Sequence, residues 1–143
     1  MFALKNKLRN APTELIQQAK SEIEEIIRNV RGINFIMLCS TDGFELASIH
    51  KKDIYNNSKL AAVCSSILAM VAAFMQEIHL DGCQTITLDA DNGKAILTAV
   101  NSVNHPMIIV ALADKDILLG QLLYSLKTAS SNIRSHAEAF QPT

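Results

Sequence analysis

The sequence of 143 residues contains no tryptophan, and aromatic residues make up only 5% of it. Its 13 lysines and arginines are nearly balanced by 14 aspartates and glutamates, which gives a formal net charge of −1. A chain that is close to neutral has no basic field to attract nucleic acid or an anionic membrane surface. The scarcity of aromatic rings also leaves little surface for stacking on bases. We therefore expect no nucleic-acid partner.

Cysteine is scarce as well, since Cys39, Cys64 and Cys83 are the only three and stand far apart. An odd and widely spaced set does not define a disulfide framework, and two of the three fall within apolar runs. We expect buried free thiols in a reducing compartment. The basic residues near the N-terminus are not followed by an apolar stretch of signal-peptide length. The sequence thus predicts a cytoplasmic protein.

Motifs that carry chemistry are also missing. The five glycines never approach the spacing of a phosphate-binding loop, and no serine has the glycine flanks of a nucleophile elbow. Residues 89–93 resemble the start of a calcium loop, but Val100 stands where such a loop needs glutamate, so a hairpin turn is the simpler interpretation. The four histidines have no cysteine or carboxylate at ligand spacing. We predict no enzyme, no metal site and no cofactor.

The most informative stretch that is present runs from Ser58 to His79 without glycine or proline and is rich in alanine, leucine and methionine. We expect a long helix here, with Ser58 as a candidate for its N-terminal cap. At about 100° per residue the bulky apolar side chains gather on one side, and these are Leu60, Val63, Cys64, Ile67, Leu68, Val71, Phe74, Met75 and Ile78. The opposite side carries small and nearly uncharged residues, which are Ala61, Ala62, Ser65, Ala69, Ala72, Ala73 and Gln76.

A helix that covers a core from outside normally shows charged residues on its far side. Here the far side has methyl and hydroxyl groups, and small residues let two backbones approach closely, so we expect a second copy of the helix there. Burial of the helix inside one monomer is an alternative, and a membrane span is another. The uncharged run from Leu60 to Met75 is shorter than the roughly 20 residues that a bilayer requires, so we expect no membrane insertion.

The other elements follow from periodicity and turn residues. A one-sided amphipathic helix is expected from Pro12 and Thr13 to about Arg31, and a final helix begins after Asp116 and fades near Ser135. Tight turns between neighbouring strands make the sheet mainly antiparallel, and the two strands that are almost wholly apolar must be central. The strands are expected at residues 33–39, 44–49, 85–89, 95–100 and 107–113.

This order of elements predicts an α+β fold. A five-stranded, mainly antiparallel sheet has the long helix on one face and the two terminal helices on the other. We divide the chain into a flexible N-terminal tail at 1–12, a domain at 13–135 and a C-terminal tail at 136–143.

The strand at residues 85–89 has no lysine, proline or bulge to prevent pairing with a second chain, provided that it lies at the edge of the sheet. Together with the small face of the long helix, this predicts a homodimer formed through edge strand and helix. An edge covered within the monomer is the alternative. The predicted interface residues are Ala62, Ser65, Ala69, Ala72, Ala73, Gln76, Thr85 and Thr87.

Several short motifs add specificity through their order: Gly32-Ile33 before a strand, the turn 41–43, Lys59-Leu60-Ala61-Ala62 at the start of the long helix, Gly82, Asn92-Gly93, and Leu119-Gly120-Gln121-Leu122-Leu123 in the last helix. In this order they resemble the roadblock/dynein light chain family over roughly residues 15–133. The resemblance implies a profilin-like α/β/α sandwich and homodimers in which long helices pair and third strands join two sheets. It also implies partners, because family members bind Ras-like small GTPases or serve as scaffolds, and short prokaryotic members are similar to MglB-type regulators of a polarity GTPase.

Three functions are therefore compared. The first is a dimeric binding module that regulates a Ras-like small GTPase by holding the GTPase's own residues in a productive arrangement. An arginine finger is a competing mechanism for this function, with Arg28, Arg31 and Arg134 as candidates. The second is a scaffold that dimerises and recruits partners without altering nucleotide turnover. The third is a small-molecule sensor or enzyme built on the same sandwich, which a deep polar pocket would favour.

Overall fold

The computed structural model describes residues 12–50, 55–82 and 84–139. Almost all of the predicted N-terminal tail, the last residues of the predicted C-terminal tail, and Cys83 lie outside these ranges. The elements are α2 (Thr13–Asn29), β1 (Ile33–Ser40), β2 (Glu45–His50), α3 (Asn57–Glu77), β3 (Thr85–Ala90), β4 (Gly93–Val100), β5 (Met107–Ala113) and α4 (Leu119–Ala137).

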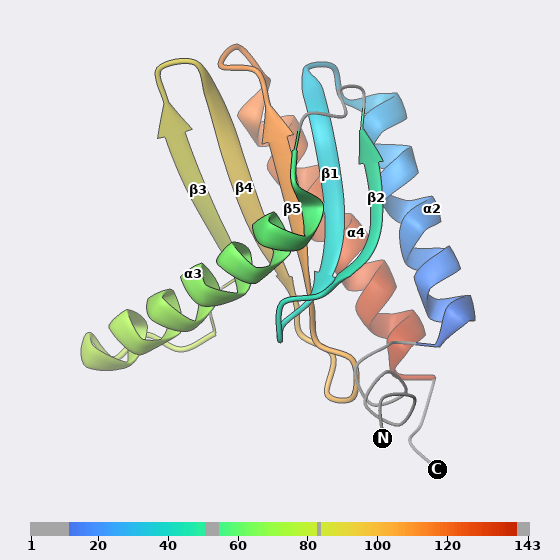
Figure 1. Cartoon of the computed structure of the whole chain (residues 1–143), viewed down its shortest axis with the longest axis vertical. Coiled ribbons are helices and arrows are strands. Elements are labelled where there is room, and N and C mark those ends of the chain that lie inside the picture. The colour runs from blue at the N-terminus through green and yellow to red at the C-terminus, as the bar shows by residue number, and fades with distance from the viewer. Residues whose placement is uncertain (1–11, 51–54, 83, 140–143) are drawn as a thin grey trace.

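The five strands form one antiparallel sheet in the order β2-β1-β5-β4-β3. Helices α2 and α4 lie side by side on one face of the sheet, and α3 crosses the other face diagonally (Figure 1). The most apolar strand, β5, lies at the centre of the sheet, where helices cover both of its faces and its apolar side chains are buried. The predicted α+β sandwich, with one long helix on one face and two helices on the other, is confirmed.

The face under α2 and α4 holds the larger hydrophobic core. Buried residues recur at helical spacing along both helices, and each buried large aliphatic side chain stabilises the fold by about 1.5–3 kcal/mol relative to exposure. Helix α4 continues beyond the predicted end near Ser135, because Ala137 is still fully buried. The buried helix residues are Leu15, Ala19, Ile23 and Ile26 of α2, and Leu122, Leu126, Ala129, Ile133 and Ala137 of α4.

The face under α3 holds a smaller core. Only Ala61 and Cys64 of α3 are buried, and they join a cluster of sheet residues. The cap of α3 is Asn56 rather than the predicted Ser58: the Asn56 Oδ1 accepts the backbone N–H of Lys59 at 3.1 Å. Asn56 has the extended backbone of a cap, whereas Ser58 is already inside the helix. The sheet residues of this core are Phe35, Met37, Cys39, Leu97, Ile108 and Val110.

The hairpin turn between β1 and β2 is docked on α3. The Ser65 hydroxyl donates a hydrogen bond of 2.5 Å to the carbonyl oxygen of Thr41. Gly43 has a φ of +97°, and a Cβ there would lie 3.4 Å from the Cα of Ala62. The turn therefore needs glycine for its left-handed backbone, and its close approach to α3 fixes the first half of that helix on the sheet.

Gly93 opens β4 where the sheet is tightly packed, and this generates a test. A Cβ at Gly93 would lie only 2.9 Å from the backbone oxygen of Ala113, which sits in the central strand and cannot move away at low cost. We expect Gly93→Ala to lower the free energy of unfolding by about 1–3 kcal/mol. The measurement is urea unfolding followed by circular dichroism.

Gly120, in the first turn of α4, is the matched control. A Cβ there meets no atom within 4 Å, and alanine forms helix better than glycine by up to about 1 kcal/mol. Gly120→Ala is therefore expected to leave the stability unchanged or to raise it. Equal losses in the two variants would contradict the packing explanation.

The two thiols under α3 generate a second test. Burial raises the pKa of Cys39 to about 12, with smaller contributions from Cys64 and Glu45, and burial also raises the pKa of Cys64. Because only the thiolate reacts, we expect both thiols to resist alkylation in the folded protein at pH 8. In a Cys83→Ser background, we expect mass spectrometry to detect iodoacetamide adducts only after the protein has been unfolded. Fast labelling of the native protein would contradict this assignment.

Candidate functional site

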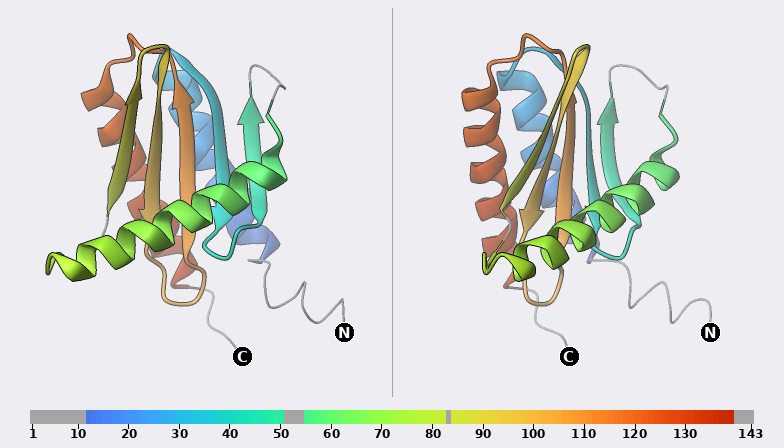
Figure 2. Two further views of the ribbon diagram at one scale, coloured as in Figure 1. Left: turned by 60° about the vertical axis from the view of Figure 1, so that its left-hand side comes forward. Right: turned by 90° about the vertical axis from the view of Figure 1, so that its left-hand side faces the viewer.

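The second half of α3 extends past the sheet. Beyond Cys64 no residue of α3 is fully buried, and the end of the helix projects past the β3 edge (Figure 2). The helix has 21 residues and is about 31 Å long, whereas the outer strands of a five-stranded sheet are about 19 Å apart. Because the start of α3 is held at β2 and the helix is longer than the sheet is wide, its end extends past β3 (Figure 2).

The outward side of α3 is an apolar stripe that we call the α3 ridge. Its two largest side chains, Met70 and Phe74, are 71% and 63% exposed. Leu88 of β3 is also about half exposed, on the same face of the sheet. Soluble monomers rarely leave an apolar surface of this kind open, so it marks an interaction site. The α3 ridge consists of Ala62, Val63, Ser66, Ala69, Met70, Ala73 and Phe74.

The predicted interface residues fall into two groups. Ser65 is half-buried and its hydroxyl is bonded to the β1–β2 turn of its own chain, so it is used within the monomer. Ala61, which the sequence placed on the same small face, is buried beside it. The remaining predicted residues are exposed in the described chain, and these are Ala62, Ala69, Ala72, Ala73, Gln76, Thr85 and Thr87.

Sequence reasoning missed the bulky part of the ridge. Val63 and Phe74 were expected on the core-facing stripe, yet both are exposed. Apolar residues occur around most of the circumference of this helix. Periodicity alone therefore does not show whether Val63 and Phe74 face the sheet or the solvent. The length of the predicted helix relative to the width of a five-stranded sheet was a signal that part of the stripe could lie outside the sheet.

Strand β3 lies at the edge of the sheet, which is the condition on which the predicted pairing with a second chain depends. It pairs with β4 from Thr85 opposite Thr98 to Ala90 opposite Gly93, and in the described part of the chain no strand pairs with its other side. Ile86 faces the core under α3, and Thr85 and Thr87 therefore face α4. Such an edge can accept a strand from another chain.

At the opposite edge, the start of α3 is tied to β2. The Asn57 Nδ2 donates to the Glu45 carboxylate at 2.7 Å and to the Ser48 hydroxyl at 3.2 Å. The two edges of the sheet therefore differ, and β3 is the one that α3 leaves accessible to another chain.

By length and composition alone, α3 is the one helix in the described ranges that could cross a membrane. Its first half, however, packs on β1 through Ala61 and Cys64, and leaving the sheet would expose that core. The segment after Cys64, residues 65–77, is about 20 Å long, which is less than the about 30 Å of a bilayer core. The packing of α3 therefore favours a protein partner over a membrane as its cover.

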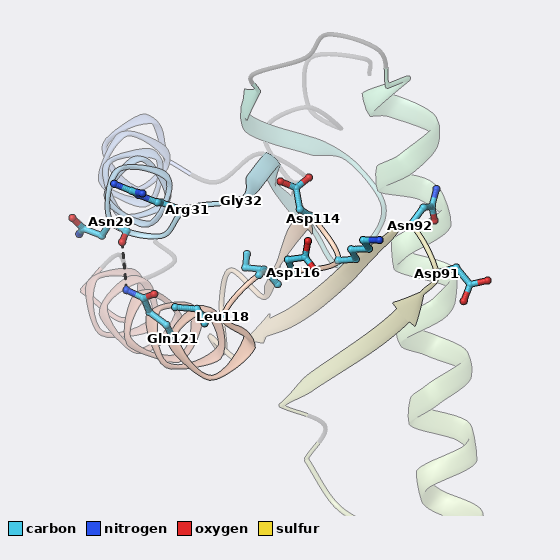
Figure 3. A pocket seen from close by; sticks show the side chains of 11 residues that line it. Asn29, Arg31, Gly32, Asp91, Asn92, Asp114, Asp116, Leu118 and Gln121 are labelled. Carbon is cyan, nitrogen blue, oxygen red and sulfur yellow. Dashed lines mark hydrogen bonds between the residues drawn. The ribbon is translucent and has the colours of Figure 1, made fainter.

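A polar cavity of about 900 Å³ lies where α2 ends and α4 begins (Figure 3). The Asn34 side chain donates to the Asp114 carboxylate at 2.9 Å, and the Gln121 side chain donates to the backbone oxygen of Asn29 at 3.4 Å. Acidic and basic side chains are mixed in its lining, with Arg31 and Asp116 among them. These two hydrogen bonds stay within the chain, and a lining of mixed charge does not favour a ligand of one charge.

The candidate arginines lie in separate places. Arg28 forms an ion pair of 2.8 Å with Glu25, and hydrogen bonding by Arg28 lowers the pKa of that exposed carboxyl group. Arg31 lines the polar cavity, and Arg134 lines a second pocket beside β3. Of the three, Arg28 is already held in an ion pair with a residue of its own helix.

The candidate metal ligands are also separated. Within the described ranges, no group of three or more histidine, cysteine, aspartate or glutamate side chains could hold a metal ion. The ring of His50 stacks on Phe35 with centroids 6.5 Å apart, and burial lowers the pKa of His105 in the loop before β5. These histidines are therefore part of the packing around the sheet.

Comparison with known proteins gives the family. The Roadblock/LC7 domain model matches residues 20–119. The gliding protein MglB from Thermus thermophilus has a TM-score of 0.81 at 17% identity, over 92% of this chain and 96% of that one. Myxococcus xanthus MglB has a TM-score of 0.82 at 13% identity, over 93% and 97% of the two chains.

A further structure, described as MglB with a tetrameric arrangement, has a TM-score of 0.80 at 17% identity over 91% of this chain and 95% of that one. Among curated proteins, none matches the sequence significantly. Identities this low show a shared fold, whereas the family match spans most of the sequence. The chain belongs to the Roadblock/LC7 domain family.

Proposed function

We propose that this protein is a cytoplasmic, dimeric binding module that regulates a Ras-like small GTPase and has no catalytic site of its own. The observation that carries the proposal is the exposed α3 ridge next to the open edge of β3. Membership of the Roadblock/LC7 family and the fold shared with MglB support it.

A twofold axis beside β3 accounts for both features at once. Antiparallel pairing of two β3 strands joins two five-stranded sheets into one, and the end of α3 that projects past β3 then covers the partner's half of the same face. An interface of this kind is isologous, because each copy offers the same strand and the same helix. The likeness to an MglB with a tetrameric arrangement supports self-association in general.

The composition of the ridge suits this packing. Ala69 and Ala73 lie one helical turn apart, so two crossing α3 helices can approach closely there. Met70 and Phe74 flank the alanines and supply the apolar area, at about 1.5–3 kcal/mol for each side chain that becomes fully buried. Association also costs rotational and translational freedom, so several such residues must be buried together.

Such a dimer can regulate a GTPase without supplying a catalytic group of its own. The dimer offers a broad and continuous platform, and a GTPase held on it can have its mobile switch segments fixed in the conformation that hydrolyses GTP. Recruitment without any change in turnover is the alternative function, and it uses the same platform. The rate of GTP hydrolysis, rather than the structure, distinguishes regulation from recruitment.

Charge on the α3 ridge tests the dimer. Ala73→Glu places a carboxylate on each copy at the proposed helix crossing, while glutamate remains a good helix former. We expect the variant, like Ala69→Glu, to change from dimer to monomer in multi-angle light scattering with an unchanged circular dichroism spectrum. The control is Ala139→Glu, at an exposed alanine outside the ridge. A dimer that persists in both ridge variants would show that the interface lies elsewhere.

GTP turnover tests the regulatory role. Purified Ras-like small GTPases of the source organism are loaded with GTP, and single-turnover hydrolysis is measured with and without the protein. We expect one of them to hydrolyse GTP at least about tenfold faster, a gain of about 1.4 kcal/mol in the barrier. The Ala73→Glu variant should lose the effect. Binding with unchanged turnover would establish the scaffold alternative, and no binding by any GTPase would refute both.

A further inference from the structure

A second pocket lies on the face of the sheet opposite the α3 ridge, between α4 and the strands β3 and β4. Its volume is about 520 Å³, within the usual range for small-molecule sites. Helix α4 contributes one wall, and the β3–β4 pair contributes the floor and the other wall. The hydroxyl and cationic side chains that line the pocket include those of Thr85, Thr87, Thr98, Lys127, Ser131 and Arg134.

The charge in this pocket has one sign. Lys127 and Arg134 line it, and no aspartate or glutamate is among its described lining residues. Neither cation forms an ion pair with any described residue. Asp89 lies on the same side of β3, but the Lys94 ammonium group already binds its carboxylate at 2.5 Å. The pocket therefore has an uncompensated positive charge.

The floor contains a hydroxyl group without a partner. Thr98 is only 3% exposed, and its Oγ1 has no hydrogen-bond partner among the described residues. A buried polar group left in this state costs about 1–3 kcal/mol. The neighbouring Ser130 differs, because its hydroxyl donates to the backbone oxygen of Ala99 at 2.8 Å. Thr98 is thus poised to hydrogen-bond to a molecule that enters the pocket.

Further hydroxyl groups surround that position. Thr85 is directly opposite Thr98 in the antiparallel register, and Thr87 follows on the same face of β3. Ser131 lines the pocket from α4. Hydroxyl and cationic donors without a competing carboxylate are suited to the oxygens of a phosphate group, which accept charge-assisted hydrogen bonds.

We propose that this pocket binds the phosphate group of a small phosphorylated molecule. Lys127 and Arg134 are two helical turns apart, about 10.5 Å along α4, so the ligand is longer than one phosphate ion. A second phosphate or a sugar body spans that distance. The α3 ridge lies on the other face of the sheet, so binding here does not depend on a GTPase held on that ridge, although the pocket shares Thr85 and Thr87 of β3 with the proposed dimer edge.

Calorimetric titration with inorganic pyrophosphate, ribose 5-phosphate and inorganic phosphate tests the proposal and separates its two ligand forms. We expect saturable binding of pyrophosphate or ribose 5-phosphate with a Kd below about 1 mM, and at least tenfold weaker binding of inorganic phosphate. Lys127→Gln and Arg134→Gln should each weaken binding at least tenfold. The control Lys20→Gln removes an exposed charge from α2, away from the pocket, and should leave the Kd unchanged.

Thr98→Val tests the pocket without changing its charge, in contrast to the Lys127 and Arg134 variants. Valine keeps the shape of threonine and removes the unpaired hydroxyl, so the ligand-free variant should have a higher Tm than the wild type while binding the probe more weakly. Failure of all three probes to bind, or equal weakening by Lys20→Gln, would overturn the proposal. A lower Tm of ligand-free Thr98→Val would also overturn it, because the hydroxyl would then have a structural partner.

Discussion

The structure depends on how α2, α3 and α4 cover the two faces of one antiparallel sheet. Two helices, α2 and α4, cover one face, and a single helix has to serve the other. By crossing diagonally, α3 reaches the β1 side of the sheet, but its second half projects beyond the β3 edge. The apolar surface that remains on α3 and the unpaired edge of β3 are two consequences of this one geometry.

The two faces of the β3 edge consequently have different chemistry. The α3 side is apolar and offers a ridge with alanines at its centre, which suits a protein surface of matching shape. The α4 side is polar and positively charged, with threonine hydroxyls on the strands and two cations on the helix. Since strand side chains alternate between faces, one short edge strand supplies both surfaces.

Much of the architecture could be predicted from local patterns. The almost wholly apolar residues of β1 and β5 indicated inner strands, and the Asp42-Gly43 turn indicated a hairpin. The cap of α3 was misplaced, because Asn56, Asn57 and Ser58 are all good caps and only the backbone path decides among them. The outward position of Phe74 was also missed, since periodicity cannot show where a helix runs out of sheet.

The sequence by itself determined the type and order of the elements, the antiparallel hairpins and the apolar character of α3, because these depend on residues a few positions apart. Only the tertiary structure decided which half of α3 packs on the sheet and which half is left exposed. It also decided that Thr98 lines the same pocket as Lys127 and Arg134, which follow it in the sequence by roughly 30 and 35 positions. Contacts of that kind are set by strand register and by the position of a helix on the sheet, which no local pattern of residues specifies.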